Sequence, residues 1–320
     1  MLASPHDNFF KALFSKPRLA ADLLRSVLPP EVAGCIDWST LVAEPASFIE
    51  ETLRGAYADL LFSAEMDGFT VKIYVLLEHQ STYDRQMARR LLHYMDRIWK
   101  TAPPDAPYLP VIFPIVIHHG EVSWPGRTDF HSMFAMPPGC APFVPQFQFT
   151  LMDLTEMDPA LLHEQAVSAG VCLGLSVLKS ARSSTHLDEL LRGWRDLIYK
   201  IMAEPFEDGA LRVIIRYLFE TRGKEQYEGA VRAMTEIEKD HAGGDMETIA
   251  QMLMREGRIE GRTEGRTEGA RNMVMKAIRL RLGEVPRAVQ VQIEAANEDD
   301  LQVWLERVLR SSSVEELLTG

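Results

Sequence analysis

Residues 56–62 read Ala-Tyr-Ala-Asp-Leu-Leu-Phe, and residues 71–80 read Val-Lys-Ile-Tyr-Val-Leu-Leu-Glu-His-Gln. Both stretches are rich in β-branched, aromatic and aliphatic residues, a composition typical of β-strands. The polar sequence Glu65-Met66-Asp67-Gly68 between them is a hairpin signal. The sequence therefore predicts two neighbouring antiparallel strands joined by a tight turn.

Two carboxylates interrupt these apolar stretches, Asp59 in the first and Glu78 near the end of the second. A carboxylate in an apolar strand is costly to bury unless a metal, a proton or a partner compensates its charge. Because side chains alternate between the two faces of a strand, Glu78 and Gln80 are expected to point the same way and His79 the other way. We expect this carboxylate and amide to lie side by side, with Asp59 within reach across the hairpin.

Hard oxygen ligands of this kind suit Mg²⁺ or Mn²⁺, which keeps several waters and takes one or two protein carboxylates. The pattern therefore predicts a metal site at Asp59 and Glu78, where an ion can polarise a phosphate and activate a water. The spacing also allows a plainer interpretation, since acidic residues are common at the ends of strands. Asp59 would then cap or pair with another group, and Glu78 would end a strand near solvent.

The same residues resemble the core of the PD-(D/E)XK nuclease superfamily, in which an acidic strand residue is followed by Glu-x-Lys, or its variant Glu-x-Gln, on the next strand. Residues 6–11 (His-Asp-Asn-Phe-Phe-Lys), 44–49 (Glu-Pro-Ala-Ser-Phe-Ile), 57–61 and 74–81 extend the likeness. Together they resemble the Rpn family of recombination-promoting nucleases, also labelled transposases, most closely over the N-terminal half. The resemblance gives Asp59, Glu78 and Gln80 the places of the superfamily's catalytic acid, acid and lysine.

The resemblance implies an α/β fold: a restriction-endonuclease-like core with a mixed sheet flanked by helices, plus an α-helical C-terminal extension. It also implies a DNA endonuclease that depends on Mg²⁺, or on Mn²⁺ or Ca²⁺, hydrolyses phosphodiester bonds and promotes recombination. The chain departs from the superfamily at Gln80, because glutamine carries no charge to stabilise a phosphate. The alternative is a catalytically weak, nuclease-derived DNA-binding or interaction module, or a transposase-associated protein.

The N-terminus predicts a helix that begins near Ser4-Pro5, a capping serine and a first-turn proline, and stops at Lys16-Pro17. In the superfamily an acidic residue on the opening helix often completes the metal site, and the resemblance places Asp7 there, with His6 and Lys11 nearby. Asp7 has an alternative role, which is to stabilise the positive end of the helix dipole.

Residues 84–100 combine positive charge with apolar residues at helical spacing, so they predict an amphipathic helix that packs on the sheet. Arg85 and Arg89 on this helix, together with Lys11, are the predicted nucleic-acid contacts, because a nuclease needs local positive charge to hold phosphates. Arg89 and His93, one turn apart, face either the site or solvent. The formal net charge of −12 argues against a surface that is basic throughout.

The chain is expected to have four parts. Residues 1–155 would form the nuclease-like core, 156–245 a helical extension, 246–272 a repeat helix or linker, and 273–320 a small helical C-terminal domain. The three cysteines have neither metal-ligand spacing nor an even count, which favours a reducing compartment. Neither a signal segment nor an apolar run long enough to cross a bilayer is evident, so we expect a cytoplasmic protein without a membrane partner.

A Glu-Gly-Arg unit recurs every four residues within residues 255–270. On a helix, Gly257, Gly261, Gly265 and Gly269 would form a nearly continuous stripe that lets a second helix approach closely. The sequence therefore predicts a homo-oligomer assembled through the C-terminal half. A flexible charged linker is the alternative, because each glycine costs an exposed helix about 1 kcal/mol relative to alanine.

Overall fold

The chain divides into two compact units, Met1–Met246 and Glu247–Gly320. The boundary lies between the predicted helical extension and the glycine repeat, and the finer divisions within each unit stay predictions. The structure is a computed structural model, and the residues it describes are 4–45, 58–78, 84–158, 168–181, 183, 185–204, 208–222, 224–242, 267–281, 283, 285 and 287–311.

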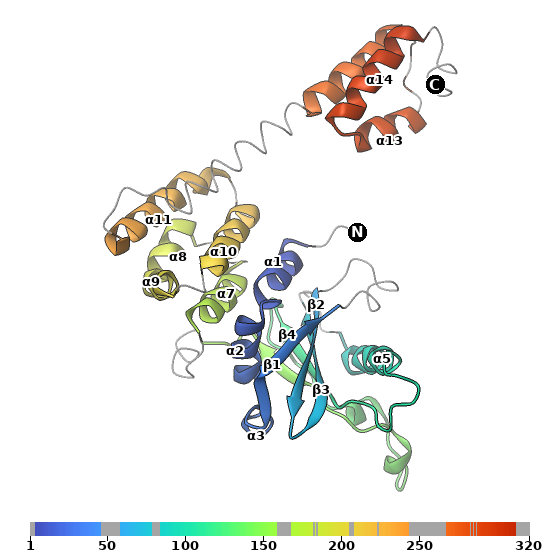
Figure 1. Cartoon of the computed structure of the whole chain (residues 1–320), viewed down its shortest axis with the longest axis vertical. Coiled ribbons are helices and arrows are strands. Elements are labelled where there is room, and N and C mark those ends of the chain that lie inside the picture. The colour runs from blue at the N-terminus through green and yellow to red at the C-terminus, as the bar shows by residue number, and fades with distance from the viewer. Residues whose placement is uncertain are drawn as a thin grey trace. The chain divides into compact units, whose positions relative to one another are not determined.

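The first unit is built on a mixed five-stranded sheet with the order β1-β2-β3-β4-β5 (Figure 1). Strand β2 pairs antiparallel with both β1 and β3, whereas β4 runs parallel to β3 and β5 parallel to β4. The expected mixed α/β sheet is thus confirmed. The strands are β1 (Ile36–Glu44), β2 (Ala58–Met66), β3 (Phe69–Glu78), β4 (Ile112–His118) and β5 (Thr150–Asp153).

The predicted hairpin is confirmed. Strands β2 and β3 pair without interruption from Ala58 opposite Leu77 to Met66 opposite Phe69. Asp67 and Gly68 form the turn with φ angles of 51° and 82°. Both angles lie in the left-handed region, which glycine adopts freely and aspartate tolerates, so this dipeptide fixes the register of the two strands.

Strand β1 is not evident from sequence periodicity. Along it only Ile36 and Leu41 are buried, and its register with β2 shifts between Asp37 and Val42. Such an irregularity breaks the strict alternation of apolar and polar residues by which a half-buried strand is recognised.

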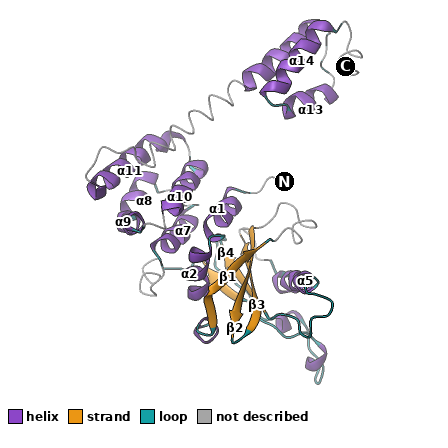
Figure 2. Ribbon diagram, viewed as in Figure 1, coloured by secondary structure: helices purple, strands orange, loops and turns teal. Residues whose placement is uncertain are grey.

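Helices cover the two faces of the sheet (Figure 2). Helix α5 (Met87–Trp99) lies in the crossover from β3 to β4 and packs on one face, as its amphipathic pattern predicts. Helices α1 (Pro5–Phe14) and α2 (Pro17–Val27) lie on the opposite side, where α1 contacts β2 and α2 contacts β1 and β5 (Figure 1).

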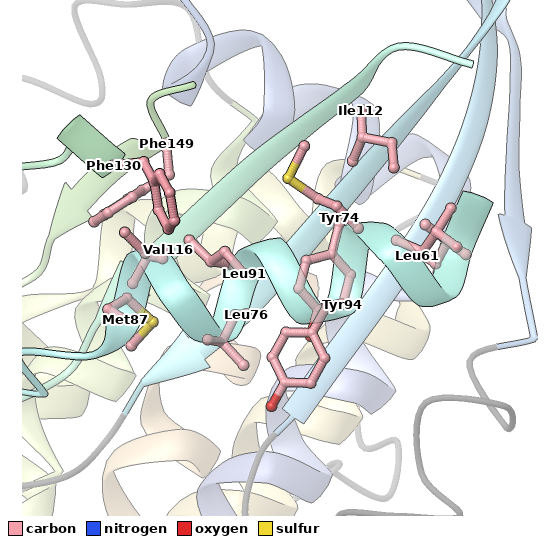
Figure 3. Packing of buried hydrophobic residues seen from close by; sticks show 13 residues of the cluster. Leu61, Tyr74, Leu76, Met87, Leu91, Tyr94, Ile112, Val116, Phe130 and Phe149 are labelled. Atoms are coloured by element: carbon pink, nitrogen blue, oxygen red, sulfur yellow. The ribbon is translucent and has the colours of Figure 1, made fainter. Parts of the chain in front are cut away.

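Aromatic and aliphatic side chains fill the space between α5 and the sheet. Leu61, Tyr74 and Leu76 project from β2 and β3 towards Met87 and Leu91 of the helix (Figure 3). Each of these five side chains is at most 2 % exposed. The helix is therefore fixed against the same sheet face on which the candidate carboxylates lie.

The rest of the first unit is largely helical. Helix α10 packs against α1, which links this helical part to the sheet. No helix among the residues that the structure describes is long and apolar enough to cross a membrane. The remaining elements are the helices α3 (Pro30–Ala33), α7 (Ala169–Ser180), α8 (Leu187–Gly193), α9 (Arg195–Ala203), α10 (Asp208–Thr221) and α11 (Tyr227–Ala242), and the 3-10 helices η1 (Phe130–Met133), η2 (Ala141–Phe143) and η3 (Lys224–Gln226).

The second unit contains helical residues 267–281 and the helices α13 (Arg287–Ala295) and α14 (Glu298–Arg310). Its core includes Val274, Ile278 and Leu301. Of the glycine stripe, only Gly269 is among the described residues, and a Cβ added there would meet no atom within 4 Å. The other three glycines lie outside the described residues, so self-association through the stripe stays a prediction.

Candidate active site

Asp59 and Glu78 lie on the same face of the sheet. Asp59 is paired with Leu76, and cross-strand partners share a face, as do residues two apart on one strand. Asp59 and Glu78 are therefore diagonal neighbours on adjacent strands. Asp59 is 7 % exposed and Glu78 is 1 % exposed. The plainer interpretation of Glu78 as a strand end near solvent is therefore wrong.

Arg90 of helix α5 is the counter-ion of Glu78. Its Nη1 atom lies 2.9 Å from Oε2 of Glu78 and 2.7 Å from Oδ2 of Asp84. Burial acts to lower the pKa of Arg90, but the hydrogen bond to Asp84 and the charge of Glu78 outweigh it and raise the pKa. The guanidinium is therefore permanently charged and holds Glu78 in an ion pair.

The rotation of helix α5 decides which of its basic residues reaches the carboxylates. Met87 and Tyr94 are buried against the sheet, and Arg90 lies between them at helical spacing, so it points to the same side. Arg89 and His93 are exposed, so of the two orientations left open for this pair the solvent-facing one is correct. Arg90 is not among the site residues predicted from sequence, and its helical spacing from Met87 and Tyr94 is the signal that identifies it.

Tyr74 adds a buried hydroxyl to the site. It lies on the same face as Asp59, and its ring centroid is 5.3 Å from that of Tyr94. Burial raises the pKa of Tyr74 well above its ordinary value, and the negative charge of Asp59 raises it further. Tyr74 is therefore a neutral phenol at physiological pH, able to donate a hydrogen bond to a carboxylate.

The opposite side of the same sheet end carries a histidine and tyrosine cluster. The backbone N–H of His119 donates to the backbone oxygen of Glu78 at 2.7 Å. The ring of His119 lies 5.2 Å from that of His6 on α1, and Nδ1 of His6 is 2.5 Å from the hydroxyl of Tyr217 on α10. His118 instead contacts Trp124 and the backbone oxygen of Val122. The two adjacent histidines thus diverge, as expected of neighbouring strand residues.

Asp7 lies in the first turn of α1, where it forms a capping box with Ser4. The backbone N–H of Ser4 donates to Oδ2 of Asp7 at 3.3 Å, and the backbone N–H of Asp7 donates to Oγ of Ser4 at 3.2 Å. The predicted N-cap at Ser4 is therefore confirmed, and the carboxylate of Asp7 has a structural task. A catalytic role for Asp7 stays a prediction.

The remaining predicted site residues are Arg85, Lys11 and Gln80. Arg85 is exposed near the start of α5, and Lys11 is half-buried on α1. Gln80 lies outside the described residues. By the resemblance, Gln80 stands where the superfamily has a lysine. The place of its amide in the site therefore stays a prediction from sequence.

Asp59 and Glu78 fit a hydrated Mg²⁺, which commonly takes one or two protein carboxylates and fills its other positions with water and substrate oxygens. No group of three or more His, Cys, Asp or Glu side chains gathers as metal ligands within the described part of the chain. A site for a fully protein-coordinated ion such as structural zinc is therefore not seen there. Any ion bound at Glu78 must compete with Arg90 for its carboxylate.

Sequence comparison identifies the family. A family model described as "Putative transposase, YhgA-like" matches residues 4–207. This chain belongs to that family. The match to the YhgA-like family extends from α1, through the whole sheet and the carboxylates, to the end of α9.

Relatives of this YhgA-like protein occur in Escherichia coli strain K12. The inactive recombination-promoting nuclease-like protein RpnE is 29 % identical over 264 residues, which are 80 % of this chain and 83 % of that protein. The recombination-promoting nuclease RpnC is 35 % identical over 154 residues (48 % and 51 %), and RpnA is 27 % identical over 260 residues (80 % and 85 %). No solved structure matches the chain. Because the relatives include proteins named as nucleases and others named as inactive, membership of the family leaves the activity of this chain to be decided by its own site.

Proposed function

We propose that this protein is a DNA endonuclease of the PD-(D/E)XK type that depends on a divalent ion, Mg²⁺ or alternatively Mn²⁺ or Ca²⁺, and promotes recombination. The observation that carries the proposal is the pair of buried carboxylates, Asp59 and Glu78, on one face of adjacent strands. The names of RpnA and RpnC support it. The mixed sheet with helices on both sides is consistent with the proposed core.

In this proposal Asp59 and Glu78 would hold the ion through their carboxylate oxygens. A bound ion of this class polarises a phosphate and lowers the pKa of an attacking water. The buried position of the two carboxylates strengthens their attraction for a cation relative to carboxylates in water. Gln80 would orient the water or the phosphate, since its amide both donates and accepts hydrogen bonds.

DNA is the proposed partner. Arg85 and Arg89 are exposed to solvent near the start of α5, so the phosphate backbone of DNA bound along this helix can contact them. Lys11 is proposed as a further contact. Local positive charge of this kind can hold DNA even though the whole chain has a formal net charge of −12.

A second function remains a candidate, a nuclease-derived DNA-binding or interaction module with little or no cleavage. The ion pair between Arg90 and Glu78 favours it, because a carboxylate that is neutralised by a guanidinium is a weaker metal ligand. The name of RpnE, an inactive nuclease-like protein, is in keeping with it. The two functions differ in whether purified protein cuts DNA when a divalent ion is supplied.

Plasmid nicking separates the two functions. We expect the purified protein to convert supercoiled plasmid to nicked circles with Mg²⁺ or Mn²⁺ and to be inactive in EDTA. Asp59→Asn and Glu78→Gln keep the size of each side chain and remove its charge, and each should lower the nicking rate at least about 100-fold because a metal ligand is lost. Their circular dichroism spectra should match that of the wild type.

Glu65→Gln is the matched control, because Glu65 lies on β2 and on the same face as Asp59 but near the hairpin turn, where it accepts a hydrogen bond from Thr70. It should cut like the wild type. Wild-type nicking rates in either site variant would refute the site, and a wild type that binds DNA without cutting it under any of the ions would favour the interaction module.

A further inference from the structure

We propose that Arg90 is the cationic residue that contacts the scissile phosphate. When a divalent ion binds, the guanidinium of Arg90 would leave Glu78 and pair with the phosphate instead. This inference rests on the proposed nuclease function. It assigns to α5 a phosphate-binding task at the carboxylate site.

Arg90 is held by two carboxylates at different depths. Glu78 is 1 % exposed, whereas the side chains of Asp84 and Arg90 are 19 % and 20 % exposed. The same Nη1 atom is shared between Oε2 of Glu78 and Oδ2 of Asp84. Arg90 therefore spans from the buried carboxylate to the rim of the site, and losing one of the two partners would leave it anchored by the other.

A divalent ion on Glu78 changes this balance. Glu78 holding a divalent ion would attract Arg90 less strongly, and the guanidinium would be repelled by the added positive charge. The ion pair with Asp84 is not disturbed in this way, so it would keep Arg90 at the rim of the site. The Nη1–H group released from Glu78 would then be able to donate to a phosphate.

Guanidinium chemistry suits that position. The planar guanidinium presents five N–H donors in a fixed fork and binds phosphate oxygens through paired hydrogen bonds. Arginine is not deprotonated in proteins, so Arg90 keeps this charge. Asp59, Glu78 and Asp84 carry two more negative charges than Arg90 offsets, and one divalent ion would balance that excess.

Two opposite effects test the exchange. Arg90→Gln removes the cation that competes for Glu78, so Mn²⁺ alone, titrated into DNA-free protein by calorimetry, should bind about 3- to 10-fold more tightly than to the wild type. At saturating Mn²⁺ the nicking rate of the same variant should fall about 100-fold or more, because a charge that stabilises the phosphate is lost. Arg90→Lys, which keeps a positive charge without the fork, should recover part of that rate.

Lys100→Gln is the matched control, since Lys100 is an exposed cation that pairs with Asp96 at the far end of the same helix. It should change neither quantity by more than about twofold, as expected for a surface ion pair. If Arg90→Gln weakens Mn²⁺ binding and slows cutting together, Arg90 only maintains the shape of the site and the inference is wrong.

Unchanged nicking by both Arg90 variants at saturating Mn²⁺ would also overturn the inference while leaving the proposed nuclease intact. A wild type that neither binds Mn²⁺ nor cuts would instead refute the nuclease itself. Arg90→Lys keeps a positive charge beside Glu78 and Asp84, so it provides a second comparison if the glutamine variant is unstable.

Discussion

The two faces of the sheet are built from the same strands and have opposite chemistry. The face turned away from α5 is apolar throughout its centre, whereas the α5 face contains buried ionisable groups among its apolar ones. The pairing of β2 with β3 places Asp59, Tyr74 and Glu78 on the α5 face. It places on the other face Leu60, Phe62, Ala64, Val71, Ile73, Val75 and Leu77.

This difference separates residues that stabilise the fold from the residues that we propose carry out its function. A buried carboxylate is costly unless it is compensated, and a sheet that needed only stability would present apolar residues on both faces. On the α5 face the cost at Glu78 is offset by Arg90, which reaches it from the covering helix. We infer that adding a carboxylate to the apolar face lowers the free energy of unfolding, whereas removing the charge of a carboxylate from the α5 face raises it.

The largest effect is expected from placing a carboxylate on the apolar face. Ile73 is fully buried there, so Ile73→Asp should lower the free energy of unfolding by at least about 4 kcal/mol, through lost apolar burial and an uncompensated charge. Urea denaturation, or loss of soluble protein, measures the effect. Phe69→Asp is the control, because Phe69 lies on the same strand and face but is 69 % exposed at the hairpin. Equal effects of the two substitutions would contradict the assignment of the apolar face.

An intermediate effect is expected in the layer that covers the apolar face. A Cβ added to Gly174 of α7 would lie 2.4 Å from a methyl carbon of Leu13 on α1. Gly174→Ala should therefore lower the free energy of unfolding by about 1–3 kcal/mol through overpacking, although alanine is the better helix former. Gly193→Ala on α8, where a Cβ meets no atom within 4 Å, should be neutral or stabilising. Thermal unfolding of both variants tests the difference, and a stable Gly174→Ala protein would show that α1 and α7 can separate.

The smallest effect on the free energy of unfolding, an increase instead of a decrease, is expected at the carboxylate site. Asp59→Asn removes the charge of a buried carboxylate that lies near Glu78, so in EDTA it should raise the free energy of unfolding by about 0.5–1 kcal/mol. Added Mg²⁺ should stabilise the wild type by mass action and leave the variant unchanged. Urea denaturation with and without Mg²⁺ measures both quantities. A loss of more than about 2 kcal/mol would instead make Asp59 a structural residue.

Much of this arrangement can be predicted from local sequence. Strand composition and the Asp67-Gly68 turn determine the hairpin, and alternation along β3 places Glu78 on a defined face. Ser4 marks the start of α1, and the apolar periodicity of residues 84–100 predicts α5. These features depend on contacts between residues that are close in sequence, or on the regular spacing of side chains along one helix or one strand.

The missed features depend on contacts between distant segments. Arg89 and Arg90 are adjacent in sequence, and only the rotation of α5 on the sheet turns Arg90 towards Glu78. The contact of His6 with Tyr217 joins residues more than 200 positions apart, which no local pattern reveals. The capping box of Asp7 is local, by contrast, and it agrees with the predicted alternative role of Asp7 at the N-terminus of α1.

The central claim is that Asp59 and Glu78 together hold the catalytic ion, and a crystal structure with Mn²⁺ tests it most directly. Anomalous scattering should show a Mn²⁺ peak about 2 Å from a carboxylate oxygen of each residue, the coordination distance of small hard cations. Asp59→Asn crystals grown in the same solution should lack the peak. A wild-type protein that cuts DNA with Mn²⁺ while the peak lies elsewhere, and neither carboxylate contacts an ion, would contradict the account.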